Sequence, residues 1–205
     1  MHINFTKTNF VLGETVPVII IYENASDKKL VRPDPSESLD VVMHVVDSQN
    51  KEDLNYTMGM LKTTVIDMAS GQFVDEMPKI KDIEIAPGAS YSFSSDIHER
   101  VYLRPGKFDC FASENKTESD HVQIRIDFTK ASVDYLASIS MDQGKEYGRR
   151  EWAMDWIGKI YPPYQLKIPV AGDSESTRLN HEKYNKQKYD EFLKWWHANR
   201  KSIEF

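Results

Sequence analysis

The fold is decided above all by the stretch LGETVPVIIIYEN, residues 12–24. Gly13 marks a turn, and the chain then alternates with a period of two. Residues on one face of the resulting strand are Val16, Val18, Ile20 and Tyr22. Because the opposite face carries Ile19 and Ile21, we expect this strand to be central in its sheet and covered on both sides.

Two later phrases repeat the same plan of a turn followed by a strand. They are IAPGASY, residues 85–91, and RPGKF, residues 104–108. Each contains a Pro-Gly pair, a strong signal for a turn. Together with the first stretch they predict an antiparallel β-sandwich.

Other segments supply the rest of this sandwich. Residues 120–128 alternate most regularly, with Val122, Ile124, Ile126 and Phe128 on one face. Further strands are predicted within 3–9, 39–47, 90–96 and 106–113, with one or two more within 55–85. Their inward residues include Leu39, Val41, Met43, Val45, Tyr91, Phe93, Phe108, Cys110 and Ala112. About seven short strands separated by turns favour an immunoglobulin-like sandwich.

The pattern changes to a helical period after Phe128. Helices are predicted around 133–141, around 152–160 before Pro162-Pro163, and over 180–202, with a loop at 169–177. The first two are expected to form an antiparallel hairpin. Three tryptophans, Trp152, Trp156 and Trp196, are predicted to be buried. Trp195 lies about 100° from Trp196 around the helix and is predicted to form an exposed contact. We therefore expect a mainly β protein with a sandwich domain, 1–128, and a helical tail of about three helices, 129–205.

Charge divides along the same boundary. Residues 1–128 contain 13 Lys and Arg against 21 Asp and Glu, a formal charge of −8, whereas 129–205 carry 13 against 11, or +2. The acidic first part argues against nucleic-acid binding. Since no run of 18 apolar residues occurs, no membrane span is predicted.

Motifs for catalysis and cofactor binding are missing from the sequence. His181-Glu182 begins like a zinc-binding motif, but Asn185 stands where the second histidine is required. The other histidines are scattered, and Cys110 is predicted to be a small buried apolar residue. We therefore expect a protein that is not an enzyme and that uses no metal or other cofactor.

Candidate binding residues come from loops and from the tail. Asp34, Glu37 and Asp40 place carboxylates in a loop of Pro and Ser, within the predicted contact loop 26–38. A second predicted contact loop, 97–104, carries His98, Arg100 and Tyr102. Trp195 completes the set.

The three turn phrases resemble the bacterial intracellular proteinase inhibitor family and related immunoglobulin-like domains. In that family a Gly-Glu-x-Val strand ends in Asn, as in Gly13 to Asn24, and Pro-Gly-x-Ser and Pro-Gly-x-Phe phrases follow. The resemblance covers residues 3–128 and implies the sandwich. The tail resembles a single HEAT-like helical hairpin ending in a Trp-Trp phrase, a resemblance that implies no activity.

The sequence thus predicts a non-enzymatic protein-binding module of bacterial type, with contacts through the sandwich loops. Two alternatives stay open: an inhibitor or immunity-type protein that blocks a specific enzyme, and a carbohydrate-binding accessory domain. The partner's identity is not specified by the sequence. The residues after Met1 lack the pattern of a signal peptide, which fits a cytoplasmic protein or a periplasmic one whose signal has been removed.

Overall fold

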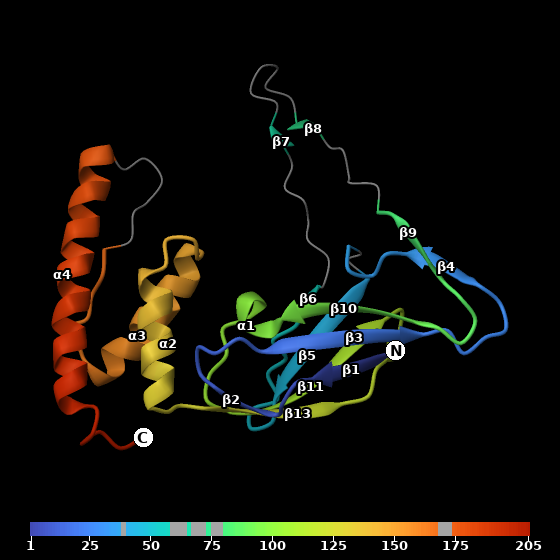
Figure 1. The fold of residues 1–205 in the computed structure, drawn as a ribbon, viewed down its shortest axis with the longest axis horizontal. Helices are drawn as coiled ribbons and strands as arrows, with labels where there is room; N and C mark the ends of the chain where they lie inside the picture. The colour runs from blue at the N-terminus through green and yellow to red at the C-terminus, as the bar shows by residue number, and fades with distance from the viewer. Residues whose placement is uncertain (38–39, 58–64, 67–72, 75–79, 168–173) are drawn as a thin grey trace. The chain divides into compact units, whose positions relative to one another are not determined.

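The computed structural model describes residues 1–37, 40–57, 65–66, 73–74, 80–167 and 174–205. Ser38, Leu39, Gly71 and most of the predicted loop 169–177 lie outside the described residues. The chain combines antiparallel sheets with helices (Figure 1) and groups into two compact units. The first unit is Met1–Thr8, Val16–Val101 and Gly106–Arg125, and the second is Asn9–Thr15, Tyr102–Pro105 and Ile126–Phe205.

One sheet of the first unit has the order β1-β3-β10. Its strands are β1 (His2–Phe5), β3 (Pro17–Glu23) and β10 (Ser90–Asp96), paired antiparallel. The prediction that the strand within 12–24 is central in its sheet is confirmed. Val18 and Ile20 are fully buried, whereas Ile19 and Ile21 are half-buried, so the second face is covered only in part.

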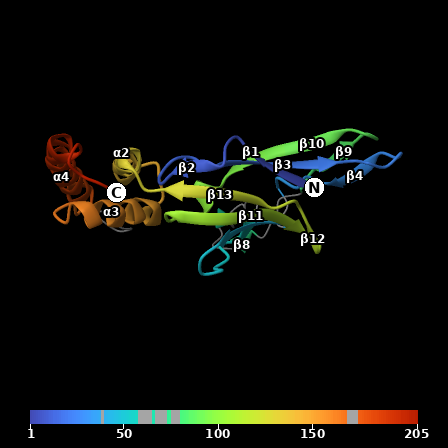
Figure 2. The ribbon, with the colours of Figure 1, turned by 90° about the horizontal axis from the view of Figure 1, so that it is seen from below.

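The second sheet of this unit runs in the order β13-β11-β5-β6, with β12 also paired to β11. Its strands are β5 (Val41–Asp47), β6 (Tyr56–Thr57), β11 (Gly106–Glu114), β12 (Thr117–Glu118) and β13 (Val122–Asp127). Figure 2 shows β3 and β10 in one layer and β11 and β13 in another. As predicted, Phe108, Cys110 and Ala112 are buried. The alternate residues of β11 therefore face outward.

Shorter elements complete the first unit. They are β4 (Leu30–Pro33), paired with β9 (Asp82–Ile85), β7 (Val65–Ile66), paired with β8 (Phe73–Val74), and the one-turn helix α1 (Ile97–Arg100). The structure describes thirteen strands where about seven were expected. The additional strands have only two to four residues each, and residues 55–85 contribute four where one or two were expected.

The second unit contains the helices α2 (Lys130–Met141), α3 (Tyr147–Ile160) and α4 (Glu175–Asn199). All three lie where the helical period predicts them. Strand β2 (Asn9–Val11) also belongs here, and Leu12 N donates to Asp127 O just beyond it. The Thr129 N–H donates to Ser132 Oγ at the start of α2, and α3 ends two residues before Pro162. No helix in the described ranges is both long and apolar enough to span a membrane.

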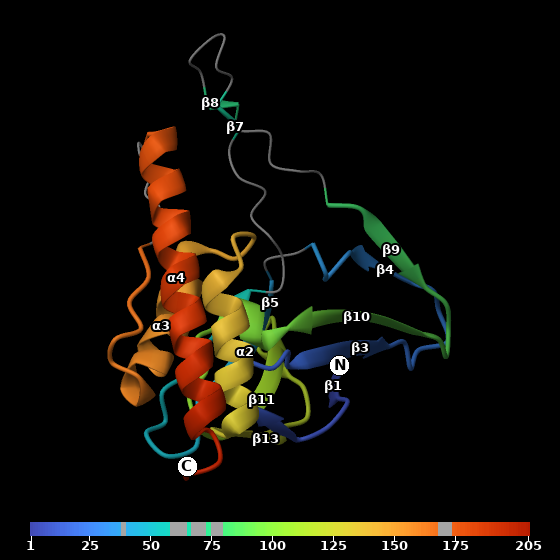
Figure 3. The same ribbon diagram turned by 60° about the vertical axis from the view of Figure 1, so that its left-hand side comes forward.

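Packing in the second unit centres on aromatic residues of α4. Figure 3 shows α4 running alongside α2, and the Trp196 Nε1–H donates to Asp134 Oδ1 at 2.8 Å. Phe192 and Trp196 are buried. Trp152 and Trp156 were expected in the core but are half-buried. The ring centre of Trp152 lies 6.2 Å from that of Tyr102, and the ring centre of Trp156 lies 5.4 Å from that of Phe128.

Gly13 lies where α2 passes close to the turn. Its φ is +90°, and a Cβ added there would lie 2.8 Å from the Tyr135 Cβ. We expect Gly13→Ala to lower the free energy of unfolding by about 1–3 kcal/mol, since both the backbone and the helix must shift. Urea unfolding followed by tryptophan fluorescence measures this, because all four tryptophans belong to the same unit as Gly13.

Gly158 provides the matched control for this substitution. It lies within α3 with nothing within 4 Å of an added Cβ. Gly158→Ala should therefore raise stability by up to about 1 kcal/mol through helix propensity. Equal destabilisation by both substitutions would contradict the close approach of α2 to Gly13.

Candidate functional site

Three aromatic rings stack on the outward face of the larger sheet of the first unit. The Phe111 ring lies between His44 at 4.5 Å and His121 at 4.3 Å, with interplanar angles of 7° and 19°. Carboxylates and a hydroxyl surround these rings. We call this surface the histidine stripe; it consists of His44, Asp53, Asp109, Phe111, Ser113, Glu118 and His121.

The alternation of the strands places the stripe. In β11 the buried residues are at even positions, so Asp109, Phe111 and Ser113 share the opposite face. Phe111 is the direct cross-strand partner of His44 on β5. Directly opposed side chains lie close enough to interact. The hairpin from β11 to β12, with Asn115 and Lys116 at positive φ, returns the chain toward His121.

His44 is held at both ring nitrogens. Its Nδ1 lies 2.7 Å from Asp53 Oδ2, and its Nε2 lies 2.8 Å from Ser113 Oγ. Because an ionised carboxylate only accepts hydrogen bonds, Nδ1–H donates to Asp53. In the neutral ring, Nε2 then accepts the Ser113 hydroxyl proton. Ser113, His44 and Asp53 are thus connected in the same way as the residues of a hydrolytic Ser–His–Asp triad.

Acyl transfer needs a second feature besides this connection, namely N–H donors that stabilise the oxyanion. The backbone of Ser113 pairs with Val42 on one side and Glu118 on the other. Its N–H is therefore directed at a neighbouring strand rather than at a substrate. The geometry orients His44 firmly, and the N–H of Ser113 is not directed as an oxyanion donor.

His121 is the second titratable ring of the stripe. Its Nδ1 lies 2.8 Å from Asp109 Oδ2, and its Nε2 lies 3.7 Å from Glu118 Oε2. The hydrogen bond with Asp109 raises the pKa of His121 above its ordinary value of 6.5, although desolvation acts in the opposite direction. The stability that the His121–Asp109 pair contributes is therefore fully present below pH 6.5, and it is lost as the pH rises through the raised pKa of His121.

A titration of His121 followed by ¹H NMR tests this arrangement. We expect a pKa above 6.5 in the wild-type protein and a lower pKa in Asp109→Asn, which removes the carboxylate that accepts from Nδ1. Glu118→Gln is the control and should lower the pKa less, because Glu118 is more distant. An unchanged pKa in Asp109→Asn would contradict the ion pair.

The residues proposed from sequence lie elsewhere. Asp34 holds its own turn: its Oδ1 accepts from Ser36 N, from Ser36 Oγ and from the Tyr91 hydroxyl. Partial burial acts to raise the pKa of Asp34, but these hydrogen bonds outweigh it and the pKa lies below its ordinary value. Glu37 and Asp40 are both exposed; between them in the sequence lie Ser38 and Leu39, which are outside the described residues.

The second predicted loop is divided between the two units. In the first unit His98 is only 4% exposed, whereas Arg100 is exposed. In the second unit Tyr102 is exposed, with the Arg149 guanidinium 5.4 Å from its ring centre. Trp195, predicted to be exposed, is half-buried because its ring stacks on Tyr161 at 4.7 Å. That His98, Arg100, Tyr102 and Trp195 take part in binding stays a prediction.

Cys110 is buried, as predicted. Burial, with a smaller contribution from Asp109, raises the pKa of the thiol well above its ordinary value, so the reactive thiolate is disfavoured. In the part of the chain that the structure describes, no three His, Cys, Asp or Glu residues cluster closely enough to hold a metal ion.

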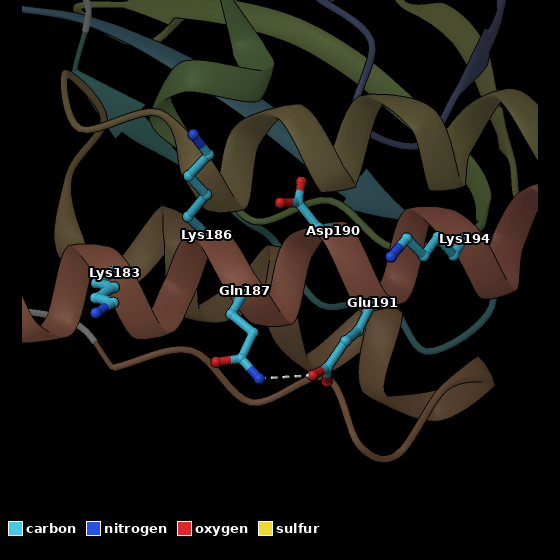
Figure 4. A pocket seen from close by; sticks show the side chains of 6 residues that line it. All are labelled: Lys183, Lys186, Gln187, Asp190, Glu191 and Lys194. Carbon is cyan, nitrogen blue, oxygen red and sulfur yellow. Dashed lines mark hydrogen bonds between the residues drawn. The ribbon is translucent and has the colours of Figure 1, made fainter.

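The surface of α4 carries a shallow, charged hollow of about 430 Å³ (Figure 4). Its lining residues are Lys183, Lys186, Gln187, Asp190, Glu191 and Lys194. Figure 4 shows Gln187 and Glu191 approaching each other, and Gln187 Nε2 donates to Glu191 Oε1 at 3.0 Å. Lys188 Nζ also donates to Glu191. These pairs are one turn apart on a solvated helix face, which supports the helix and indicates no ligand.

Comparison of the chain with models of protein families finds no match, and comparison with curated proteins finds none either. Three solved structures show weak similarity: a β-glucosidase from Erythrobacter marinus (13% identity, TM-score 0.38), a DNA-bound alkylpurine DNA glycosylase from Pseudomonas fluorescens (10%, 0.36) and a β-glucosidase from Listeria innocua with glucose (12%, 0.34). The matches cover 61–62% of this chain but only 15%, 30% and 16% of those chains, respectively. Similarity at this level assigns no activity.

Proposed function

We propose that the first unit is an immunoglobulin-like sandwich that binds a partner protein without catalysis, through the histidine stripe. The observation that carries the proposal is the ordered stack of His44, Phe111 and His121 on an outward sheet face. Rings fixed by stacking and by hydrogen bonds lose little conformational entropy on binding. Aromatic residues held in this way are typical of binding hot spots.

Charge indicates what kind of partner fits this surface. Asp53, Asp109 and Glu118 flank the rings, and residues 1–128 carry a formal charge of −8. An acidic surface of this kind attracts a basic one and raises the rate of association. We therefore propose a partner whose contact surface is rich in Lys and Arg. Loss of the partner's own enzymatic activity in the complex would identify the inhibitor alternative.

Affinity capture with charge variants tests this function. Glu118→Lys, at a side chain 59% exposed in the stripe, should abolish capture of the partner. Glu84→Lys makes the same charge change at a side chain 62% exposed on β9 and should leave capture intact. If both variants captured the same proteins as the wild type, the stripe would not be the contact surface.

A second candidate function rests on the hydrogen bonds of His44 to Asp53 and Ser113. If these residues formed an acyl-transfer site, a fluorophosphonate would label Ser113, with its phosphorus bonded to Oγ, fluoride leaving and the hydroxyl proton passing to His44 Nε2. Because the backbone N–H of Ser113 faces a paired strand, we expect no labelling above that of Ser113→Ala. Labelling lost in both Ser113→Ala and His44→Ala would favour the hydrolase.

A further inference from the structure

The second unit contains a pocket of about 390 Å³ formed by the end of α2, the segment that follows it, the start of α3 and one face of α4. Its lining residues are Met141, Gln143, Lys145, Tyr147, Arg150, Arg178, Glu182 and Asn185. The three from α4 recur at i, i+4 and i+7, so they share one face of that helix. A volume of this size accommodates a small molecule rather than a single ion.

Arg150 is the unusual member of this pocket. It is only 7% exposed, and its Nε donates to the carbonyl oxygen of Ser140 at 3.0 Å. The same serine is held in turn, because its Oγ lies 2.6 Å from the buried Tyr164 hydroxyl. The neutral carbonyl of Ser140 therefore anchors Arg150 in the wall of the pocket. Besides Nε–H, the guanidinium carries further N–H donors on its two terminal nitrogens.

The charges around Arg150 favour an anion. Lys145, Arg150 and Arg178 line the pocket, against the single carboxylate of Glu182. That carboxylate also accepts from Gln143 Nε2 at 3.4 Å. A buried cation is costly unless an opposite charge approaches it. The lining has a formal charge of +2, which matches the dianionic form of a phosphate monoester.

We propose that this pocket binds the phosphate group of a small phosphate monoester. Arg150 is the buried anchor, and its planar donors suit phosphate oxygens. Arg178 lines the pocket from α4, and Tyr147 and Gln143 offer further polar contact to the remainder of the ligand. The site is independent of the histidine stripe and of the function proposed for the first unit.

Calorimetric titration of the full chain with phenyl phosphate, inorganic phosphate and citrate tests the assignment. We expect phenyl phosphate to bind and Arg178→Ala, at an exposed residue, to weaken that binding roughly tenfold through loss of a charge-assisted hydrogen bond. Inorganic phosphate should bind more weakly, since it leaves part of the pocket unfilled. Lys186→Ala removes a lysine from the same helix outside this pocket and should leave the affinity unchanged.

Arg150→Lys is the second variant, and its thermal unfolding is compared with that of the wild type. It keeps the charge but loses the planar donors, so a folded Arg150→Lys protein should also bind phenyl phosphate more weakly. The proposal is overturned if phenyl phosphate does not bind, whether or not citrate does. It is also overturned if Arg178→Ala and Lys186→Ala reduce the affinity for phenyl phosphate equally.

Discussion

Replacing Trp196 by alanine is expected to lower the free energy of unfolding of the helical unit by about 3–5 kcal/mol. Trp196 is only 1% exposed and ties α4 to α2 through its hydrogen bond to Asp134. The substitution leaves a cavity between these helices and removes one of the two donors to the Asp134 carboxylate, the other being Arg200. Because it also removes a fluorophore, helical circular dichroism during urea unfolding is the appropriate measurement.

Two further substitutions separate the causes of this loss. Trp196→Phe keeps an aromatic ring but loses the N–H, so it should lower the free energy of unfolding by about 1–2 kcal/mol. Trp195 is half-buried and stacks on Tyr161. Trp195→Ala should therefore lower the free energy of unfolding less than Trp196→Ala does. If Trp195→Ala were as damaging as Trp196→Ala, the central position of Trp196 in this core would be wrong.

Phe111→Ala is expected to weaken binding of the captured partner at least thirtyfold, about 2 kcal/mol, as for a central hot spot. The substitution removes the ring against which both histidines stack, so His44 and His121 lose their common support. Titration of the purified partner by calorimetry measures this effect. Since Phe111 lies on the outward face of β11, the thermal unfolding temperature should change much less than the affinity.

A half-buried aromatic residue on the other sheet serves as the control for this experiment. Phe93→Ala, on β10, should reduce stability and leave the affinity of the folded protein unchanged. Equal losses of affinity in Phe111→Ala and Phe93→Ala would show that binding follows general stability and not the stripe.

Much of the secondary structure could be predicted because burial follows a simple period. The residues of β3, β5, β11 and β13 alternate between buried and less buried positions. The sequence of β13 alternates in the same way, whereas β3 and β5 carry apolar residues on both faces. The helices of the tail follow from apolar residues at helical spacing and from Pro162. Only one or two strands were predicted between 55 and 85, because a strand of two residues is too short to show an alternating pattern.

The histidine stripe was missed for a different reason. The alternation of β11 places Asp109, Phe111 and Ser113 outward, and this much is readable from sequence. Their meeting with His44 and Asp53 depends on strand register, which brings Ser113 to His44, 69 positions away in the sequence. The buried pattern of each strand fixes which residues face outward, but no hairpin turn joins β5 to β11, so register shifts of two residues keep the same pattern. The six histidines therefore looked scattered, although two of them share one aromatic stack.

Site-specific photo-crosslinking tests the proposed binding surface most directly. A benzophenone side chain is placed at Gln123, exposed on the outward face of β13 and two residues after His121, or at Ser92, exposed on β10 of the other sheet. In extract of the source cells, the Gln123 protein should give one discrete adduct that disappears in the Phe111→Ala background, and the Ser92 protein should give none. Adducts of the same pattern from both positions, or an adduct from Ser92 alone, would contradict binding through the histidine stripe.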